Sequence, residues 1–152
     1  MNNSIIEISE MSLTDFEEIQ SVLISDFDDF WNSETLKNEL KNNNSYYIVA
    51  KINNSIVGFA GIKTVLDEAD IMNIVTKKDS RNSGIGSALF SSIINYAKSN
   101  NVKKITLEVN ENNVPAIKLY KKFGFEQIAK REKYYNGTDN AIIMQLLISW
   151  LI

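Results

Sequence analysis

Apolar residues follow two periods along the chain, one typical of strands and one typical of helices. Alternating or continuous apolar runs predict strands over residues 4–9, 46–52, 56–65, 69–78, 104–109, 125–135 and 140–147. Apolar residues spaced three and four apart predict helices within residues 12–27, 33–40, 84–98 and 114–123. The resulting order, β-α-α-β-β-β-α-β-α-β-β, predicts a mixed α/β (α+β) protein.

Capping and turn residues stand at many of these boundaries. The candidate helix N-caps are Ser12 or Thr14, Ser33, and Asn113 with Pro115 in the first turn that follows it. Gly124 is placed to end the last helix. Hairpin turns are predicted at residues 53–55 and 136–137.

The composition restricts the chemistry that the protein can perform. Its 152 residues suit one domain over 1–152, and the formal net charge of -3 gives no general attraction for nucleic acid. The chain has no cysteine and no histidine, which excludes a thiol nucleophile, a Ser-His-Asp triad and an HExxH zinc site. We expect chemistry that uses carboxylates, tyrosines, lysines or backbone groups, without a metal.

The two ends of the chain contain no predicted targeting or membrane segment. The first residues lack the basic start and long apolar core of a signal peptide. The apolar run over residues 142–152 is shorter than the ~20 residues that span a bilayer, and Gln145 and Ser149 interrupt it. We expect a cytoplasmic protein with no membrane partner, in which Phe30, Trp31 and the apolar residues 150–152 are a candidate contact patch.

A glycine-containing stretch, Arg81-Asn82-Ser83-Gly84-Ile85-Gly86, joins a predicted strand to a predicted helix. A helix N-terminus offers unpaired N–H groups to an anion, and glycine lets the backbone approach a ligand closely. The spacing matches neither GxGxxG nor GxxxxGK[ST], so neither a Rossmann nor a Walker A loop is supported. Taken alone, the stretch fits a phosphate cradle and an ordinary strand-to-helix turn about equally well.

This Arg-x-x-Gly-x-Gly stretch resembles the acetyl-CoA-binding motif of the Gcn5-related N-acetyltransferases (GNAT), whose loop holds the pyrophosphate through backbone N–H groups. Further along, TLEVNENNVPAIKLYKKFGFEQI, REKYY and DNAIIMQL are similar to the RimI-type branch, the ribosomal-protein alanine N-acetyltransferases. The resemblance is best over residues 67–146. It implies acetyl-CoA as cosubstrate and the GNAT fold, in which helices flank a central mixed, mostly antiparallel sheet.

The resemblance implies that Glu108 is the general base, acting through water, and that Tyr120 is the general acid. Alternation of Ile105, Leu107 and Val109 turns Glu108 to the other face of its strand, where it could equally be a solvent-facing carboxylate. A tyrosine hydroxyl, with a pKa of ~10, can protonate a thiolate whose acid has a pKa of ~8.5 by analogy with cysteine. Tyr120 also has apolar neighbours, so its ring can pack while its hydroxyl donates.

The same resemblance implies the cofactor contacts. Arg81 adds positive charge beside the pyrophosphate. The backbone N–H groups of the cradle belong to Asn82, Ser83, Gly84, Ile85, Gly86 and Ser87. The backbone that pairs with the pantetheine arm belongs to Ile74, Val75 and Thr76. Asn113 is a further cofactor contact in the family, although its role as a helix cap is equally physical.

On the acceptor side, Arg131, Tyr134 and Tyr135 match a family segment near the peptide groove. The aspartates at 26, 28 and 29 are a solvated charge run over an aromatic cluster, or alternatively a surface for a basic peptide. We favour the charge run.

The resemblance to the RimI-type branch implies acetyl transfer from acetyl-CoA to an N-terminal α-amine, favouring the N-terminal alanine of protein eighteen of the small ribosomal subunit. With no cysteine to acylate, the amine attacks directly in a ternary complex. An α-amino group has a pKa of ~7.7–8.0 against ~10.4 for lysine, so far more of it is neutral near pH 7. Two alternatives stay open: acetylation of a small amine or of other protein N-termini, and a non-catalytic acyl-CoA-binding regulatory module.

Overall fold

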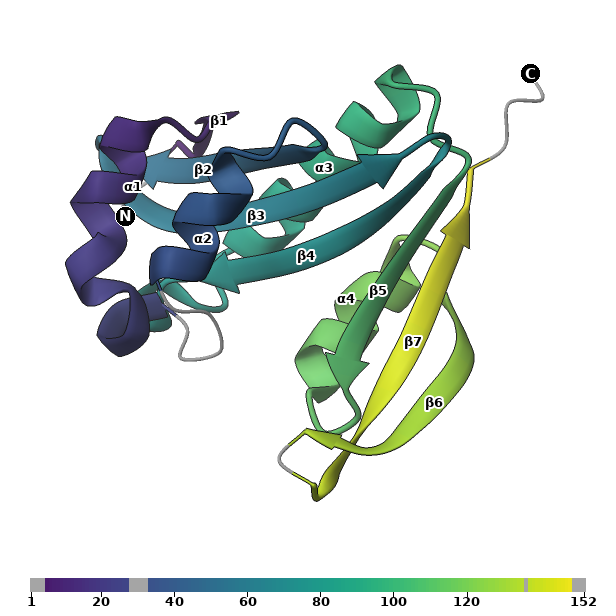
Figure 1. Ribbon diagram of the computed structural model, residues 1–152. Helices are drawn as coiled ribbons and strands as arrows, with labels where there is room; N and C mark the ends of the chain where they lie inside the picture. Colours follow the sequence, from purple (N-terminus) through teal and green to yellow (C-terminus); the bar gives the residue numbers. More distant parts are fainter. Residues whose placement is uncertain (1–4, 28–32, 136, 149–152) are drawn as a thin grey trace. The chain divides into compact units, whose positions relative to one another are not determined.

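The computed structural model describes residues 5–27, 33–135 and 137–148 (Figure 1). Its strands are β1 (Glu7–Glu10), β2 (Ser45–Ile52), β3 (Ser55–Val65), β4 (Glu68–Thr76), β5 (Lys104–Asn110), β6 (Glu126–Tyr135) and β7 (Asp139–Leu147). Its α-helices are α1 (Leu13–Ile19), α2 (Ser33–Leu40), α3 (Ile85–Ser99) and α4 (Val114–Lys122). Shorter turns are the 3-10 helices η1 (Gln20–Val22) and η3 (Lys78–Ser80) and the π-helical η2 (Leu23–Phe27).

The strands form one sheet of order β1-β2-β3-β4-β5-β7-β6. Pairs β1–β2, β2–β3, β5–β7 and β6–β7 are antiparallel, whereas β4–β5 is parallel. The predicted order of elements and the mixed, mostly antiparallel sheet are therefore confirmed. Several boundaries differ from the prediction. The first strand begins at Glu7 rather than at residue 4, and Ser33 is the first residue of α2 rather than its cap. The strand predicted over residues 69–78 ends at Thr76, and the helix predicted within residues 12–27 is α-helical only to Ile19.

Contacts divide the chain into two compact units, each made of two segments. The first unit contains residues 1–63 and 72–96, and the second contains 64–71 and 97–152.

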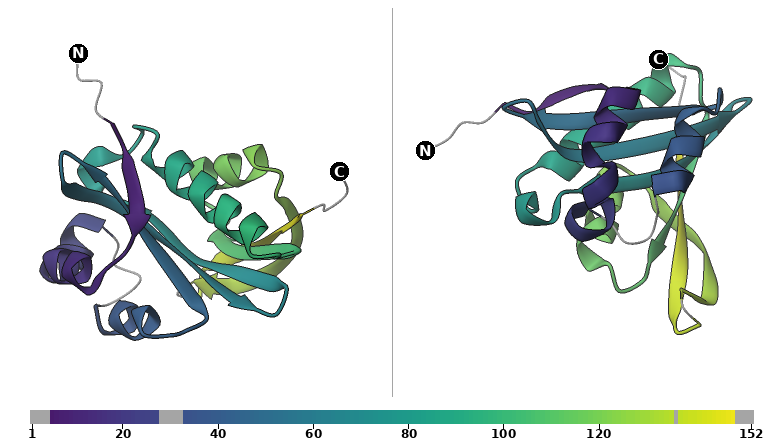
Figure 2. Two further views of the ribbon diagram at one scale, coloured as in Figure 1. Left: turned by 90° about the horizontal axis from the view of Figure 1, so that it is seen from above. Right: turned by 60° about the vertical axis from the view of Figure 1, so that its left-hand side comes forward.

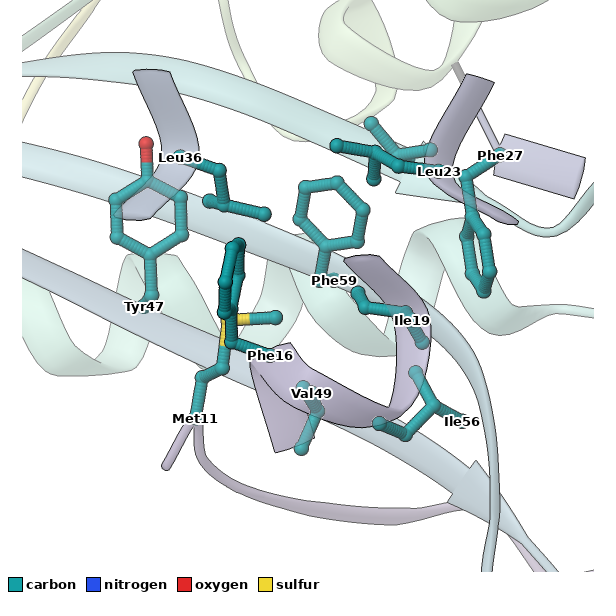
Figure 3. Close-up of a cluster of buried hydrophobic side chains, with 11 residues drawn as sticks. Met11, Phe16, Ile19, Leu23, Phe27, Leu36, Tyr47, Val49, Ile56 and Phe59 are labelled. Atoms are coloured by element: carbon teal, nitrogen blue, oxygen red, sulfur yellow. The ribbon is translucent and has the colours of Figure 1, made fainter. Parts of the chain in front are cut away.

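In the first unit, helices cover both faces of the strands, with α1 and α2 on one face and α3 on the other (Figure 2). Figure 3 shows the core on the α1 and α2 side. Its buried residues are Met11, Phe16, Ile19, Leu23, Phe27, Leu36, Tyr47, Val49, Ile56, Phe59 and Val75. On the α3 side, the rings of Tyr46 and Tyr96 stack with centroids 3.8 Å apart. Adjacent residues of β2 thus contact opposite layers, as strand alternation requires.

The start of α1 is stabilised by a capping box. The Ser12 hydroxyl accepts a hydrogen bond from the Asp15 N–H at 3.1 Å, and the Ser12 N–H donates to Asp15 Oδ2 at 2.9 Å. Lys51 of β2 lies 2.8 Å from Asp15 Oδ1. This buried carboxylate therefore connects the helix cap to the sheet.

Two left-handed asparagines make the β2–β3 hairpin turn. Asn53 and Asn54 have φ values of 51° and 65°, between the paired residues Ile52 and Ser55. Positive φ at both central residues is the type I′ pattern, which matches the twist of the strands. The hairpin predicted at residues 53–55 is confirmed.

The second unit contains the antiparallel strands β5, β7 and β6 and the first part of β4. Glu68–Asp70 of β4 pair with Lys104–Thr106 of β5, and this parallel register ends there. Ile105, Leu107 and Val109 are buried, as their alternation predicted. Glu108 therefore lies on the other face of β5.

Candidate active site

In the first unit, the predicted phosphate loop connects η3 to α3. Asn82 and Gly84 are left-handed, with φ values of 65° and 83°. The Ser83 hydroxyl donates to the Ser80 carbonyl, and the Ala88 N–H donates to the Gly84 carbonyl at 3.0 Å. Two tight bends thus bring the chain into α3 and leave the N–H groups of its first turn without intrahelical partners.

The loop and the start of α3 differ in burial. Residues 81–84 are exposed, whereas Ile85 is buried and Gly86 and Ser87 are half-buried. The buried side chain of Ile85 anchors the helix on the core, so only its backbone is available to a ligand. The geometry fits an anion cradle with Arg81 beside it, and the contact with pyrophosphate stays a prediction.

The predicted pantetheine strand is the last part of β4. Ile74–Thr76 lie beyond the register that joins β4 to β5, which ends at Asp70. Val75 is buried in the core, so its side chain is structural, as expected. Two residues before Val75, both side-chain amide atoms of Asn73 are buried without a hydrogen-bond partner. No local sequence pattern marks Asn73, because a satisfied amide and an unsatisfied one can have the same neighbours in sequence.

In the second unit, Glu108 is paired across β5–β7 with Ile143 and keeps 31% of its side-chain surface accessible. Its Oε1 atom lies 3.4 Å from Nη1 of Arg131 on β6. The sequence placed Arg131 near an acceptor peptide and gave no sign of this ion pair.

The end of α4 sets the position of Tyr120. The Gly124 N–H donates to the Lys121 carbonyl at 3.0 Å, and the Phe125 N–H donates to the Tyr120 carbonyl at 3.1 Å. With Gly124 at a φ of 96°, these bonds form a Schellman motif. The motif brings the rings of Tyr120 and Phe125 to 6.4 Å. The ring of Tyr120 is therefore packed, as expected, while its acid role stays a prediction.

Asn113 caps α4 through its side chain. Its Oδ1 atom accepts a hydrogen bond from the Ala116 N–H at 3.3 Å, and Pro115 stands in the first turn. The cap predicted from the sequence is confirmed. Asn113 is exposed, so a cofactor contact remains sterically open and stays a prediction.

A bulge in β6 determines the relative positions of Arg131 and Tyr134, two of the residues predicted to contact the acceptor. Arg131 pairs with Ala141 and Tyr135 pairs with Asp139, so residues 132–134 of β6 are opposite the single residue Asn140. Within the bulge Lys133 has a φ of 52°, and its N–H donates to Asn140 Oδ1 at 2.8 Å. The guanidinium carbon of Arg131 lies 5.5 Å from the centroid of the Tyr134 ring. The irregular strand thus brings Arg131 and Tyr134 together.

The acidic segment near residue 26 is only partly described. Phe27 is buried in the core, 6.0 Å from the Phe59 ring. Asp26 lines a pocket of about 130 Å³ whose other lining residues are Ser25, Lys77, Lys78 and Asp79. Its charge is therefore accompanied by two lysines, which supports the interpretation as a solvated charge run. The other residues named for this surface and its contact patch, 28–31 and 150–152, and the turn residue 136, lie outside the described residues.

Among the described residues, no three acidic side chains gather closely enough to hold a metal ion. In the same part of the chain, no helix has the length and apolar character needed to span a membrane.

Comparison with known proteins identifies the protein family to which the chain belongs. The pattern of the Acetyltransferase (GNAT) family matches residues 15–125. The chain belongs to this family, and it is an N-acetyltransferase of the RimI-type branch. Its relatives include the [Ribosomal protein bS18]-alanine N-acetyltransferase of Haemophilus influenzae, which is 36% identical over 143 residues, covering 90% of this chain and 95% of the relative.

Solved structures agree with that class. The ribosomal-protein-S18-alanine N-acetyltransferase of Escherichia coli superposes with a TM-score of 0.88 at 30% identity, covering 97% of each chain. Arabidopsis thaliana NAA60, solved with acetyl-CoA, has a TM-score of 0.78 at 19% identity, over 95% of this chain and 99% of that chain. This second likeness concerns the fold alone.

Proposed function

We propose that the protein transfers the acetyl group of acetyl-CoA to the N-terminal α-amino group of alanine in ribosomal protein bS18. The observation that carries the proposal is the similarity to bS18-alanine N-acetyltransferases, which extends over 90% of this chain and 95% of the Haemophilus influenzae relative. We further propose that residues 1–152 act as a single N-acetyltransferase domain. A ribosomal acceptor places this activity in the cytoplasm.

Acetyl-CoA is the cosubstrate in this proposal, and it supplies an acetyl thioester. Its pyrophosphate is held by the backbone of residues 82–87, with Arg81 beside it. The open turn at Gly84, where a Cβ would meet nothing within 4 Å, supports a backbone that a ligand can approach. The backbone of Ile74–Thr76 pairs with the pantetheine arm, in the part of β4 beyond its register with β5. Asn113 supplies a further contact.

The chemistry requires two protons to leave the α-ammonium nitrogen and one to reach the sulfur. Glu108 takes the proton from the α-ammonium through water, the amine nitrogen bonds to the thioester carbonyl carbon, and the C–S bond breaks. Tyr120 gives its proton to the departing thiolate and takes up the second proton that the attacking nitrogen loses, so that the products are the amide and the free thiol. The packed ring of Tyr120 supports this role, because packing restricts the positions that its hydroxyl can take.

The acceptor peptide lies, in this proposal, near Arg131, Tyr134 and Tyr135. The side chain of Arg131 is 54% exposed, and Tyr134 as a whole residue is 48% exposed. Exposed aromatic and guanidinium groups suit recognition of a peptide backbone.

The acceptor is tested by mass spectrometry of an alanine-initiated peptide that copies the N-terminus of bS18, incubated with purified protein and acetyl-CoA. The control is the same peptide with a blocked N-terminus. A gain of one acetyl group on the free peptide alone supports the proposal. A gain on both peptides indicates lysine acetylation, and a gain on neither refutes this acceptor.

The catalytic roles are tested with Glu108→Gln and Tyr120→Phe. Each is expected to lower kcat by about 10²-fold to 10⁴-fold, the usual contribution of a positioned acid or base. Glu126→Gln and Tyr46→Phe make the same chemical changes at β6 and β2, outside the proposed machinery, and are expected to keep kcat. Transfer at the wild-type rate in both active-site variants contradicts the assigned roles.

A further inference from the structure

The carboxylate of Glu108 is engaged by a cation from a strand that is not its neighbour. In the sheet order, β7 lies between β5 and β6. Glu108 and Ala129 both pair with Ile143, and Arg131 pairs with Ala141, two residues before Ile143 in β7. The arginine side chain therefore crosses β7 to place Nη1 at 3.4 Å from Oε1 of Glu108.

Arg131 is itself restrained. Its guanidinium carbon lies 5.5 Å from the centre of the Tyr134 ring, within the range of a cation–π contact. The bulge over residues 132–134 gives the strand the extra length between Arg131 and Tyr135 in which Tyr134 sits. A planar guanidinium with a ring contact and a carboxylate contact has few alternative orientations.

This ion pair is too exposed to serve mainly as a stabilising contact. The side chains of Arg131 and Glu108 keep 54% and 31% of their surface accessible. Pairs of this kind contribute little to folding, because water screens the charges and two long side chains must be ordered. The contact nevertheless engages one carboxylate oxygen, Oε1, and so favours orientations of the carboxylate in which Oε2 points away from the guanidinium.

We propose that Arg131 is a positioning residue that orients the carboxylate of Glu108 for proton transfer. Oε1 is held by the guanidinium, and Oε2 receives the proton that leaves the substrate ammonium. The inference rests on the proposed function, in which Glu108 is the base. It gives Arg131 a role besides the peptide contact of the proposed function, and the two roles are distinguishable because a positioning residue affects the chemical step whereas a peptide contact affects binding.

The experiment compares Arg131→Gln, Arg131→Lys and the control Lys130→Gln, which removes the same charge at the adjacent position of β6. Steady-state kinetics with the bS18 peptide give kcat and KM, and thermal unfolding gives Tm. We expect Arg131→Gln to lower kcat about tenfold to a hundredfold with little change in KM for the peptide or in Tm. Arg131→Lys recovers part of kcat, because it restores the charge but not the planar contact. Lys130→Gln is expected to resemble the wild type.

A rise in the peptide KM with unchanged kcat overturns the positioning role and returns Arg131 to peptide binding. The double variant Glu108→Gln/Arg131→Gln provides the second criterion. If Arg131 acts through Glu108, kcat of the double variant equals that of Glu108→Gln, whereas a further tenfold loss overturns the inference. If Glu108 is not the base, the single variant Glu108→Gln keeps the kcat of the wild type, so this outcome is distinguishable from a failure of the positioning role.

Discussion

Gly58 lies in β3 at a point where other elements of the first unit leave no room for a side chain. A Cβ atom there would lie 2.8 Å from the Val75 carbonyl oxygen of β4. It would also lie 3.0 Å from Ile85 Cγ2 and 3.0 Å from Leu89 Cδ1 of α3. The two side-chain ends can rotate away, but the carbonyl oxygen belongs to backbone. Gly58→Ala must therefore move β4 relative to β3.

The expected cost follows from two opposing effects. Forcing one methyl group into a packed core costs ~1–3 kcal/mol. Alanine restricts the unfolded chain more than glycine does, and this effect raises the free energy of unfolding by ~0.4–1 kcal/mol. Because one of the three contacts is with backbone, we expect a net loss of roughly 1–2 kcal/mol in the free energy of unfolding, or about a 5-fold to 30-fold change in the folded-to-unfolded ratio.

Urea denaturation of the wild type, Gly58→Ala, Leu89→Val and the double variant measures this loss. Shortening Leu89 removes one of the three contacts, so the double variant is expected to lose less than the sum of the two single variants. Gly58→Ala is also expected to raise KM for acetyl-CoA, since it displaces the strand proposed to pair with pantetheine. A free energy of unfolding within about 0.5 kcal/mol of the wild type would refute the steric reasoning.

Two further predictions concern the start of α1. Ser12→Ala removes the acceptor for the Asp15 N–H and is expected to cost about 1 kcal/mol of unfolding free energy, measured by urea denaturation, with Ser12→Thr losing less. Burial raises the pKa of Asp15, but hydrogen bonds from Lys51 and Ser12 outweigh it and hold that pKa below the ordinary value of 3.8. The carboxylate thus stabilises the fold above its unfolded pKa, and the contribution is lost as pH falls through the folded pKa. Unfolding free energies at about pH 6 and about pH 3 are expected to differ less in Asp15→Asn than in the wild type, and equal differences contradict the assignment.

Local signals predicted much of this fold, and contacts between distant residues account for what was missed. Ser12, Asn113 and Gly124 act on backbone groups within five residues of themselves, so their effect can be read from the adjacent sequence. The ion pair between Glu108 and Arg131 depends on strand order and on the reach of a side chain across an intervening strand. No hydrophobic period or sequence motif encodes the order of the strands or the reach of a side chain across one of them.

Irregular backbone was equally hard to predict. The β6 bulge depends on a left-handed lysine, Lys133, which no residue preference favours and which the Asn140 side chain stabilises from the next strand. The π-helical turn at Leu23–Phe27 continues an apolar pattern that reads as ordinary helix. Asn73 has an unsatisfied amide only because of how its surroundings pack.

The interleaving of the two compact units has a consequence for modularity. The division between the units runs through β4, because residues 64–71 belong with 97–152 whereas residues 72–96 belong with 1–63. No single break in the chain separates these two units, so the exchange of either one requires new junctions after residues 63, 71 and 96. Recombination that replaces the segment proposed to recognise the peptide must keep the β4 residues before Met72 compatible with it. Such a protein diversifies by point substitution more readily than by domain shuffling.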